Sequence, residues 1–151
     1  MTEEEIGGFA DEVGNLLVRV YEIHEMIIAE TGGLPGLRDA TVLHSAVARP
    51  FAMFGGEELY PSDFEKAGAL FHSLIKNHPF MDGTKRTALT ATLFFPDGYG
   101  HSLTAPLPLD EVIDFCVSIA EENSRQSRGE DVAPRTIREI AEWFQQLLRP
   151  S

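Results

Sequence analysis

Apolar residues recur at steps of three and four along most of the chain, which is the period of helices with one buried face. The first such run covers about residues 6–30, and the glycines and proline of residues 32–36 end it. The pattern predicts one long N-terminal helix. Its apolar stripe consists of Phe9, Val13, Leu16, Leu17, Val20, Ile23 and Ile27.

Capping residues and a proline outline a short second helix. Asp39 or Thr41 can cap its start, because both side chains can accept a hydrogen bond from a first-turn N–H group. The helix is predicted to run through Ala48, where Arg49-Pro50 closes it. The stretch 51–60 carries a pair of glycines between two short apolar runs, which is typical either of a loop or of a small hairpin flap.

Two further helices are predicted in the middle of the chain. A capping box at residues 62–65 begins the third helix, which ends near Asn77. Pro79 prevents simple continuation of that helix. The fourth helix is predicted from Thr84 to about Phe95, and Pro96-Asp97-Gly98 stops it.

The last third of the chain predicts two more helices. The fifth is expected from about residue 108 to residue 123, and the polar stretch 124–131 is expected to be an exposed connection. Pro134 fits the first turn of a sixth helix that ends at Leu148. Six helices with almost no alternating pattern predict an all-α fold, with a small hairpin as its one possible β element.

Composition and charge narrow the class of protein. A chain of 151 residues that is 43% hydrophobic is expected to form one domain over residues 1–151. The formal charge of -12 repels nucleic acid and anionic membranes. An acidic N-terminus and the lack of an apolar run of about 18 residues predict a soluble, cytoplasmic protein. The single cysteine, Cys116, lies in an apolar helical run and is interpreted as a buried thiol.

One short segment can carry chemistry, whereas zinc pairs, a Walker loop and a nucleophile elbow are missing from the chain. It combines a histidine, a carboxylate, a glycine at a predicted helix start and two adjacent cations. The N-terminus of a helix offers unpaired N–H groups and a partial positive charge, so the backbone of Gly83, Thr84 and Lys85 can cradle a phosphate. The segment reads His78-Pro79-Phe80-Met81-Asp82-Gly83-Thr84-Lys85-Arg86.

The side chains of this segment suit phosphate chemistry as well. Arg86 can hold phosphate oxygens through its planar fork, and Lys85 adds a mobile positive charge. Asp82 can ligate Mg²⁺, and His78 can take a proton from an attacking hydroxyl. Each residue also has a plain structural interpretation: a helix cap for Asp82, a solvated helix face for the two cations and a backbone-bonded loop residue for His78. Phe80 is expected to anchor the loop by burying its ring.

Residues 78–86 resemble the Fic/Doc motif, which reads His-x-Phe-x-Asp/Glu-Gly/Ala-Asn-Gly/Lys-Arg. The chain departs from it at Thr84, where the motif has asparagine. Residues 32–39 and the stretches that flank the motif are similar to the Doc branch, the death-on-curing toxins, and the likeness is strong over about residues 20–95. The matching positions are His78, Phe80, Asp82, Gly83, Lys85 and Arg86.

This resemblance implies a six-helix fold whose motif loop and following helix bind ATP with Mg²⁺. By position, His78 would be the base, Asp82 the metal ligand and Arg86 a phosphate ligand. Lys85 stands where most Fic proteins have glycine, and this favours the kinase reaction of the Doc branch over transfer of AMP.

The partners implied are a cognate antitoxin and a target protein such as elongation factor Tu, phosphorylated on a hydroxyl. Two alternatives stay open, an AMP transferase and a catalytically weak binding module in which Thr84 has replaced the motif asparagine. Residues 118–123 are also similar to the inhibitory motif Ser/Thr-x-x-x-Glu-Gly/Asn of some Fic proteins. The favoured interpretation of Glu121-Glu122 is the solvated end of a helix.

Overall fold

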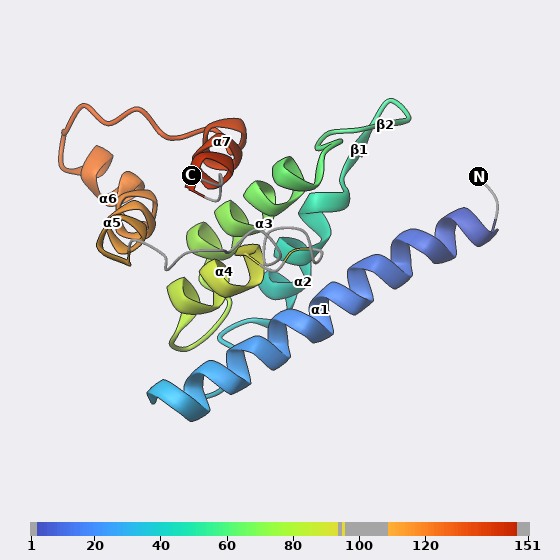
Figure 1. The fold of residues 1–151 in the computed structure, drawn as a ribbon, viewed down its shortest axis with the longest axis horizontal. Coiled ribbons are helices and arrows are strands. Elements are labelled where there is room, and N and C mark those ends of the chain that lie inside the picture. Colours follow the sequence, from blue (N-terminus) through green and yellow to red (C-terminus); the bar gives the residue numbers. More distant parts are fainter. Residues whose placement is uncertain (1–2, 94, 96–108, 148–151) are drawn as a thin grey trace.

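The computed structural model describes residues 3–93, 95 and 109–147, with side chains described for residues 12–93, 95 and 110–147. Within these ranges the chain forms seven α-helices, one 3-10 helix and one small hairpin (Figure 1), which confirms the all-α expectation. The elements in chain order are α1 (Glu3–Thr31), α2 (Ala40–Ala48), η1 (Arg49–Phe51), β1 (Met53–Phe54), β2 (Glu57–Glu58), α3 (Asp63–Asn77), α4 (Thr84–Leu93), α5 (Leu109–Ala120), α6 (Glu122–Ser127) and α7 (Ile137–Leu147).

Helix α3 is the centre of the fold. The predicted cap is confirmed, because the Ser62 hydroxyl accepts a hydrogen bond from the Glu65 N–H at 3.1 Å. The helix packs against α2, α4, α5 and α7, while α1 lies along the outside against α2 and α4 (Figure 1). Burial of its apolar side chains fixes the end of α3, and therefore the loop that follows it. The side chains with no exposed surface are Ala67, Ala69, Leu70, Phe71, Leu74 and Ile75.

The first two helices follow the predicted boundaries. Helix α1 ends at Thr31, directly before the two glycines. The N-cap of α2 is Asp39, whose carboxylate accepts from the N–H groups of Thr41 and Val42 at 2.9 and 3.3 Å. Arg49-Pro50 does not end the helical path at once, because residues 49–51 add one turn of 3-10 helix.

The stretch 51–60 contains a hairpin rather than a plain loop. Its strands pair antiparallel, with Met53 opposite Glu58. The hairpin is attached to the start of α3 by Lys66, which pairs with the Glu58 carboxylate at 3.0 Å and donates to the Tyr60 carbonyl. These contacts hold the hairpin where it projects from the helices in Figure 1.

The predicted start of the fifth helix near residue 108 agrees with the start of α5 at Leu109, but its predicted end at residue 123 is wrong. Helix α5 ends at Ala120, and α6 takes up part of the stretch expected to be an exposed connection. The reason lies in the tertiary packing. Glu122 was predicted to be solvated, but it is buried, with only 1% of its surface exposed. Its carboxylate pairs with Lys76 of α3 at 2.7 Å and accepts from the Arg135 N–H at 2.8 Å. A buried ion pair thus holds a polar turn against the core.

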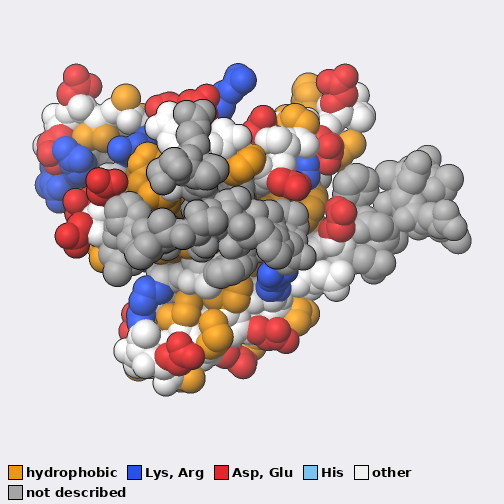
Figure 2. Space-filling view, in the orientation of Figure 1, with side chains coloured by type: hydrophobic (Ala, Val, Ile, Leu, Met, Phe, Trp, Pro, Cys, Tyr) orange, Lys and Arg blue, Asp and Glu red, His pale blue; other side chains and the backbone are white. Residues whose placement is uncertain are grey.

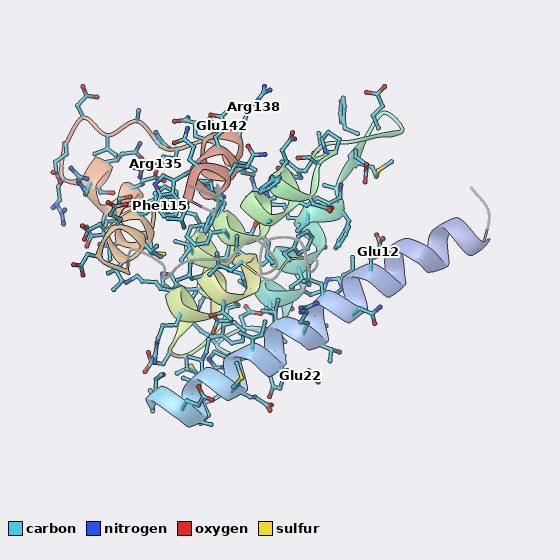
Figure 3. All side chains as sticks on the ribbon, in the orientation of Figure 1. Glu12, Glu22, Phe115, Arg135, Arg138 and Glu142 are labelled. Atoms are coloured by element: carbon cyan, nitrogen blue, oxygen red, sulfur yellow. The ribbon has the colours of Figure 1, made fainter. Side chains whose placement is uncertain are left out.

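The start of the last helix also differs from the prediction. Pro134 is not in its first turn, because α7 begins at Ile137. A capping box sets this boundary instead: the Glu139 N–H donates to the Thr136 hydroxyl at 3.1 Å, and the Thr136 N–H donates to the Glu139 carboxylate at 3.2 Å. Before the helix, the Arg135 guanidinium lies 4.9 Å from the centre of the Phe115 ring, and Figure 3 shows these two residues next to one another.

The single cysteine lies in the interior of the fold. Cys116 is buried, and burial raises the pKa of its thiol to about 11, which supports its interpretation as a buried thiol.

Figure 2 shows acidic side chains spread over the visible face. None of the described helices has the length and apolar character needed to cross a membrane. The predicted features at Phe9, residues 96–98, Pro108 and Leu148 lie outside the residues whose side chains or backbone are described.

Candidate active site

The predicted site residues gather around one cleft of about 300 Å³, between the end of α3 and the start of α4. Two other hollows, of 270 and 460 Å³, lie along α1, and neither is lined by a histidine. Within the described residues, the first cleft therefore combines a possible proton acceptor with a helix N-terminus. Its walls are formed by His78, Phe80, Met81, Asp82, Gly83, Thr84, Lys85 and Arg86.

His78 is held in an unusual backbone conformation. It is the C-cap of α3, with φ 46° and ψ 66°, and its N–H group bonds the Leu74 carbonyl at 3.2 Å. It is the one non-glycine residue with positive φ in the described ranges. Its imidazole is exposed. Partial burial, then Lys85 and then Arg38 lower the pKa of His78, so the ring is neutral and able to accept a proton at neutral pH.

The motif loop consists of residues 78–83, between α3 and α4. It is held in place by residues 33–39, called here the supporting segment. Leu37 and Phe80 form an antiparallel bridge. On either side of it, the Arg38 N–H donates to the Pro79 carbonyl at 2.7 Å, and the Met81 N–H donates to the Gly36 carbonyl at 3.1 Å. Two chain segments about 40 residues apart therefore fix one another like short paired strands. The sequence pattern did not predict this pairing.

The buried side chain of His24, on α1, anchors the motif loop. It is 1% exposed, and its Nε2 lies 2.7 Å from the Asp82 carbonyl oxygen. Because a carbonyl can only accept, Nε2 carries the proton. The imidazole stacks on Phe80, with ring centres 3.8 Å apart and planes 7° from parallel. Phe80 is 3% exposed, which confirms its expected role as an anchor.

Asp82 presents a half-exposed carboxylate at the mouth of the cleft. Its two oxygens accept from the Gly83 N–H at 2.8 Å and from the Leu34 N–H at 3.3 Å, so its orientation is fixed by backbone donors. Glycine is required at position 33, because its φ is 116° and a Cβ there would lie 2.6 Å from the Asp82 Oδ2 atom. The supporting segment can therefore approach the carboxylate only because Gly33 has no side chain.

The N-terminus of α4 forms the floor of the cleft. Its first hydrogen bond joins the Thr87 N–H to the Gly83 carbonyl at 3.0 Å, and the N–H groups of residues 84–86 lie ahead of that bond. Arg86 lies 3.9 Å from the Asp82 carboxylate and donates to Thr31 at the end of α1. Lys85 is exposed and is not paired with a carboxylate in the described ranges. This end of α4 offers two cations and a partial positive charge to an anion.

The side-chain hydroxyl of Thr84, the residue that departs from the motif, is buried. The residue is 5% exposed, and neither its hydroxyl nor that of Thr87, one turn later, has a hydrogen-bond partner in the described structure. A buried hydroxyl without a partner is unfavourable, so it does not stabilise the fold.

Replacing Thr84 by valine is therefore expected to keep or raise the free energy of unfolding, by up to about 1 kcal/mol, because valine has the same shape without the polar atom. Urea denaturation of both proteins measures this. A decrease of more than about 1 kcal/mol in the free energy of unfolding would show that the Thr84 hydroxyl makes a hydrogen bond in the folded protein. Thr87→Val is the matched control, since its hydroxyl is buried and unpartnered in the same helix.

A protein-family profile matches the part of the chain that contains the cleft. Residues 17–96 match the profile of the Fic/DOC family. The chain is 40% identical over 89 residues to the protein named Toxin Doc of Mycolicibacterium smegmatis, a match that covers 59% of this chain and 68% of that protein. It is 33% identical over 73 residues to the Protein kinase doc of Escherichia phage P1, covering 48% of this chain and 57% of that protein. The matched family region contains the whole cleft.

Proposed function

The chain belongs to the Fic/DOC family, and we propose that it is a Doc-type toxin, a kinase that transfers the γ-phosphate of ATP to a hydroxyl of a target protein. The observation that carries the proposal is the cleft itself. It joins a neutral imidazole, a backbone-fixed carboxylate and the N-terminus of a helix with two cations. These are the groups needed to deprotonate a hydroxyl and to hold a polyphosphate.

In the proposed step, the target hydroxyl oxygen attacks the γ-phosphorus while His78 takes its proton. The bond between the γ-phosphorus and the bridging β,γ oxygen breaks, and ADP leaves. The N–H groups at the start of α4, with Lys85 and Arg86, hold the phosphate oxygens on which charge collects. The protein supplies orientation and charge, which are the main contributions in phosphate transfer.

Mg²⁺ fits the residues that are present. The described ranges contain no cluster of three His, Cys, Asp or Glu side chains, so no all-protein cage forms there. Mg²⁺ is commonly held by one or two carboxylates together with phosphates and water, and Asp82 provides one accessible carboxylate. Bound there, the metal would neutralise phosphate charge.

Replacing Asp82 by asparagine is expected to raise the Mg²⁺ concentration needed for half-maximal rate by at least about tenfold, because the anionic ligand is lost. The rate is measured across a Mg²⁺ titration at saturating ATP. Asp63→Asn, at the distant start of α3, is the matched control. An unchanged Mg²⁺ dependence in the Asp82 variant would remove this residue from the metal site.

Lys85 is the residue that favours kinase chemistry over transfer of AMP. It occupies the first turn of α4, where a glycine would leave the phosphate site with one cation fewer. The relative from phage P1 is named a protein kinase. Elongation factor Tu is the target suggested by the resemblance, and a cognate antitoxin is the expected partner of a toxin of this type.

The proposal is tested with purified protein, elongation factor Tu and ATP labelled on either the α- or the γ-phosphate. Label transferred from the γ position alone supports the kinase. Transfer of the α label identifies an AMP transferase instead. If neither label is transferred by this protein or by its Thr84→Asn variant, the enzymatic proposal fails. Activity gained only in the Thr84→Asn variant would identify a weak binding module.

A further inference from the structure

Arg38 reaches the backbone on both sides of the proposed base. Its Nε atom donates to the His78 carbonyl at 2.6 Å, and its Nη2 atom donates to the Asn77 carbonyl at 2.5 Å. Its own N–H group donates to the Pro79 carbonyl at 2.7 Å. One residue of the supporting segment therefore holds three consecutive carbonyl groups around His78, while it does not line the cleft.

These contacts stabilise the end of α3 in two ways. The last carbonyls of a helix lack partners within the helix and carry partial negative charge, which a guanidinium satisfies well. In addition, His78 adopts a left-handed conformation that is unfavourable for a residue with a Cβ, and a proline follows it. Such a conformation persists only where neighbouring contacts enforce it. The fork of Arg38 makes two of those contacts.

The Arg38 charge also acts on the imidazole. Burial, Lys85 from α4 and Arg38 from the supporting segment all lower the pKa of His78. Asp82 is the acidic group of the same loop, and its carboxylate is occupied by backbone donors and lies near Arg86. Removing the Arg38 charge therefore shifts the ring toward its protonated form at a given pH.

We propose that Arg38 is a positioning residue for the base: it fixes the left-handed backbone of His78 and thereby the direction in which the imidazole enters the cleft. This inference rests on the proposed function, since it assigns His78 the role of base. The guanidinium of Arg38 contributes two things: its planar fork of donors holds the backbone carbonyls of Asn77 and His78, and its positive charge acts on the imidazole. Lysine at this position keeps the charge but loses the fork.

The test compares Arg38→Lys and Arg38→Gln with wild type and with Arg138→Gln. Arg138 is a matched control because its side chain is 83% exposed on α7, away from the cleft, and Figure 3 shows it pointing outward. Two readouts are used: kcat and KM for ATP from pH 5 to 9, and NMR of the His78 ring and of the amides of residues 77, 78, 80 and 81. The NMR readout needs no activity.

Both Arg38 variants are expected to lower kcat by about tenfold to a hundredfold with little change in KM for ATP, because the base is misplaced while the phosphate site is intact. In Arg38→Gln, the acid limb of the pH profile and the His78 titration should both move to higher pH. In Arg38→Lys they should stay near wild type. Arg138→Gln should match wild type throughout.

Wild-type kcat in both Arg38 variants would overturn the proposal, and so would a rise in KM with unchanged kcat. If the wild-type protein transfers no phosphate, the proposed function fails separately, and the NMR readout still decides the positioning role. In that case unchanged amide chemical shifts at residues 77, 78, 80 and 81 and an unchanged His78 titration in Arg38→Gln overturn it. Because Arg38 is exposed, both variants are expected to remain folded, and thermal unfolding is the measurement that checks this.

Discussion

Replacing His78 by alanine is expected to lower kcat for phosphate transfer by about 10²- to 10⁴-fold, which is the usual contribution of a positioned general base. The ring is exposed in the cleft and neutral, since burial, Lys85 and Arg38 lower its pKa. Alanine removes the proton acceptor but leaves the α4 terminus, Lys85 and Arg86 in place. KM for ATP should therefore change little.

Steady-state kinetics with γ-labelled ATP measure this effect. His44→Ala is the matched control, because His44 is an exposed histidine on α2 that does not line the cleft. A kcat for the His78 variant within threefold of wild type would remove His78 from the chemistry. So would an equal loss in both variants.

The pH dependence of the same reaction has a definite sign. The base must be unprotonated, so kcat/KM should fall as the pH decreases through the lowered pKa of His78. The acid limb therefore lies below the ordinary histidine value of 6.5. In the alanine variant, this limb should vanish from the residual rate.

The second large effect concerns stability. Replacing Glu122 by alanine is expected to lower the free energy of unfolding by about 3–5 kcal/mol, because it leaves the Lys76 ammonium unpaired in a mostly buried position. The Glu122 side chain is 2% exposed and that of Lys76 is 14% exposed, at a separation of 2.7 Å. The substitution also removes the acceptor of the Arg135 N–H, which joins α6 to the segment before α7.

Urea denaturation measures this loss, with Glu121→Ala as the control at an exposed neighbouring carboxylate. The double variant Lys76→Met, Glu122→Leu should regain most of the stability, since buried ion pairs can often be replaced by apolar residues. A loss below about 1 kcal/mol in Glu122→Ala would show that the pair is solvated. Such a result would restore the interpretation of Glu122 as an exposed residue at a helix end.

The location of the cleft was predictable because the residues that line it are nearly consecutive. A histidine, a carboxylate, a glycine and two cations around a helix start form a local pattern, and the structure places all of them around one cleft. The buried ring of Phe80 was predictable for the same reason. What the pattern could not reveal is which groups support the loop, because His24 and Arg38 lie 58 and 40 residues from the positions that they contact.

Thr84 illustrates the same limit. The motif comparison identified it as the discordant residue, and a side chain at a helix start could point into the cleft or into the core. The packing of α4 on α3 decides between these, because Thr84, Thr87 and Ala88 lie on the buried side of that helix. The hydroxyl is consequently buried and has no hydrogen-bond partner in the described structure.

By itself the sequence determined the helical class, most helix starts and the position of the cleft. These depend on interactions within a few residues, such as the Ser62 and Asp39 caps and the apolar stripes. Only the tertiary structure decided the pairing of Glu122 with Lys76, and with it the helix in a stretch that was expected to be exposed. It also decided how the supporting segment meets the motif loop. Hydrogen bonds and ion pairs between distant residues arise only when packing of the helices brings their polar groups together.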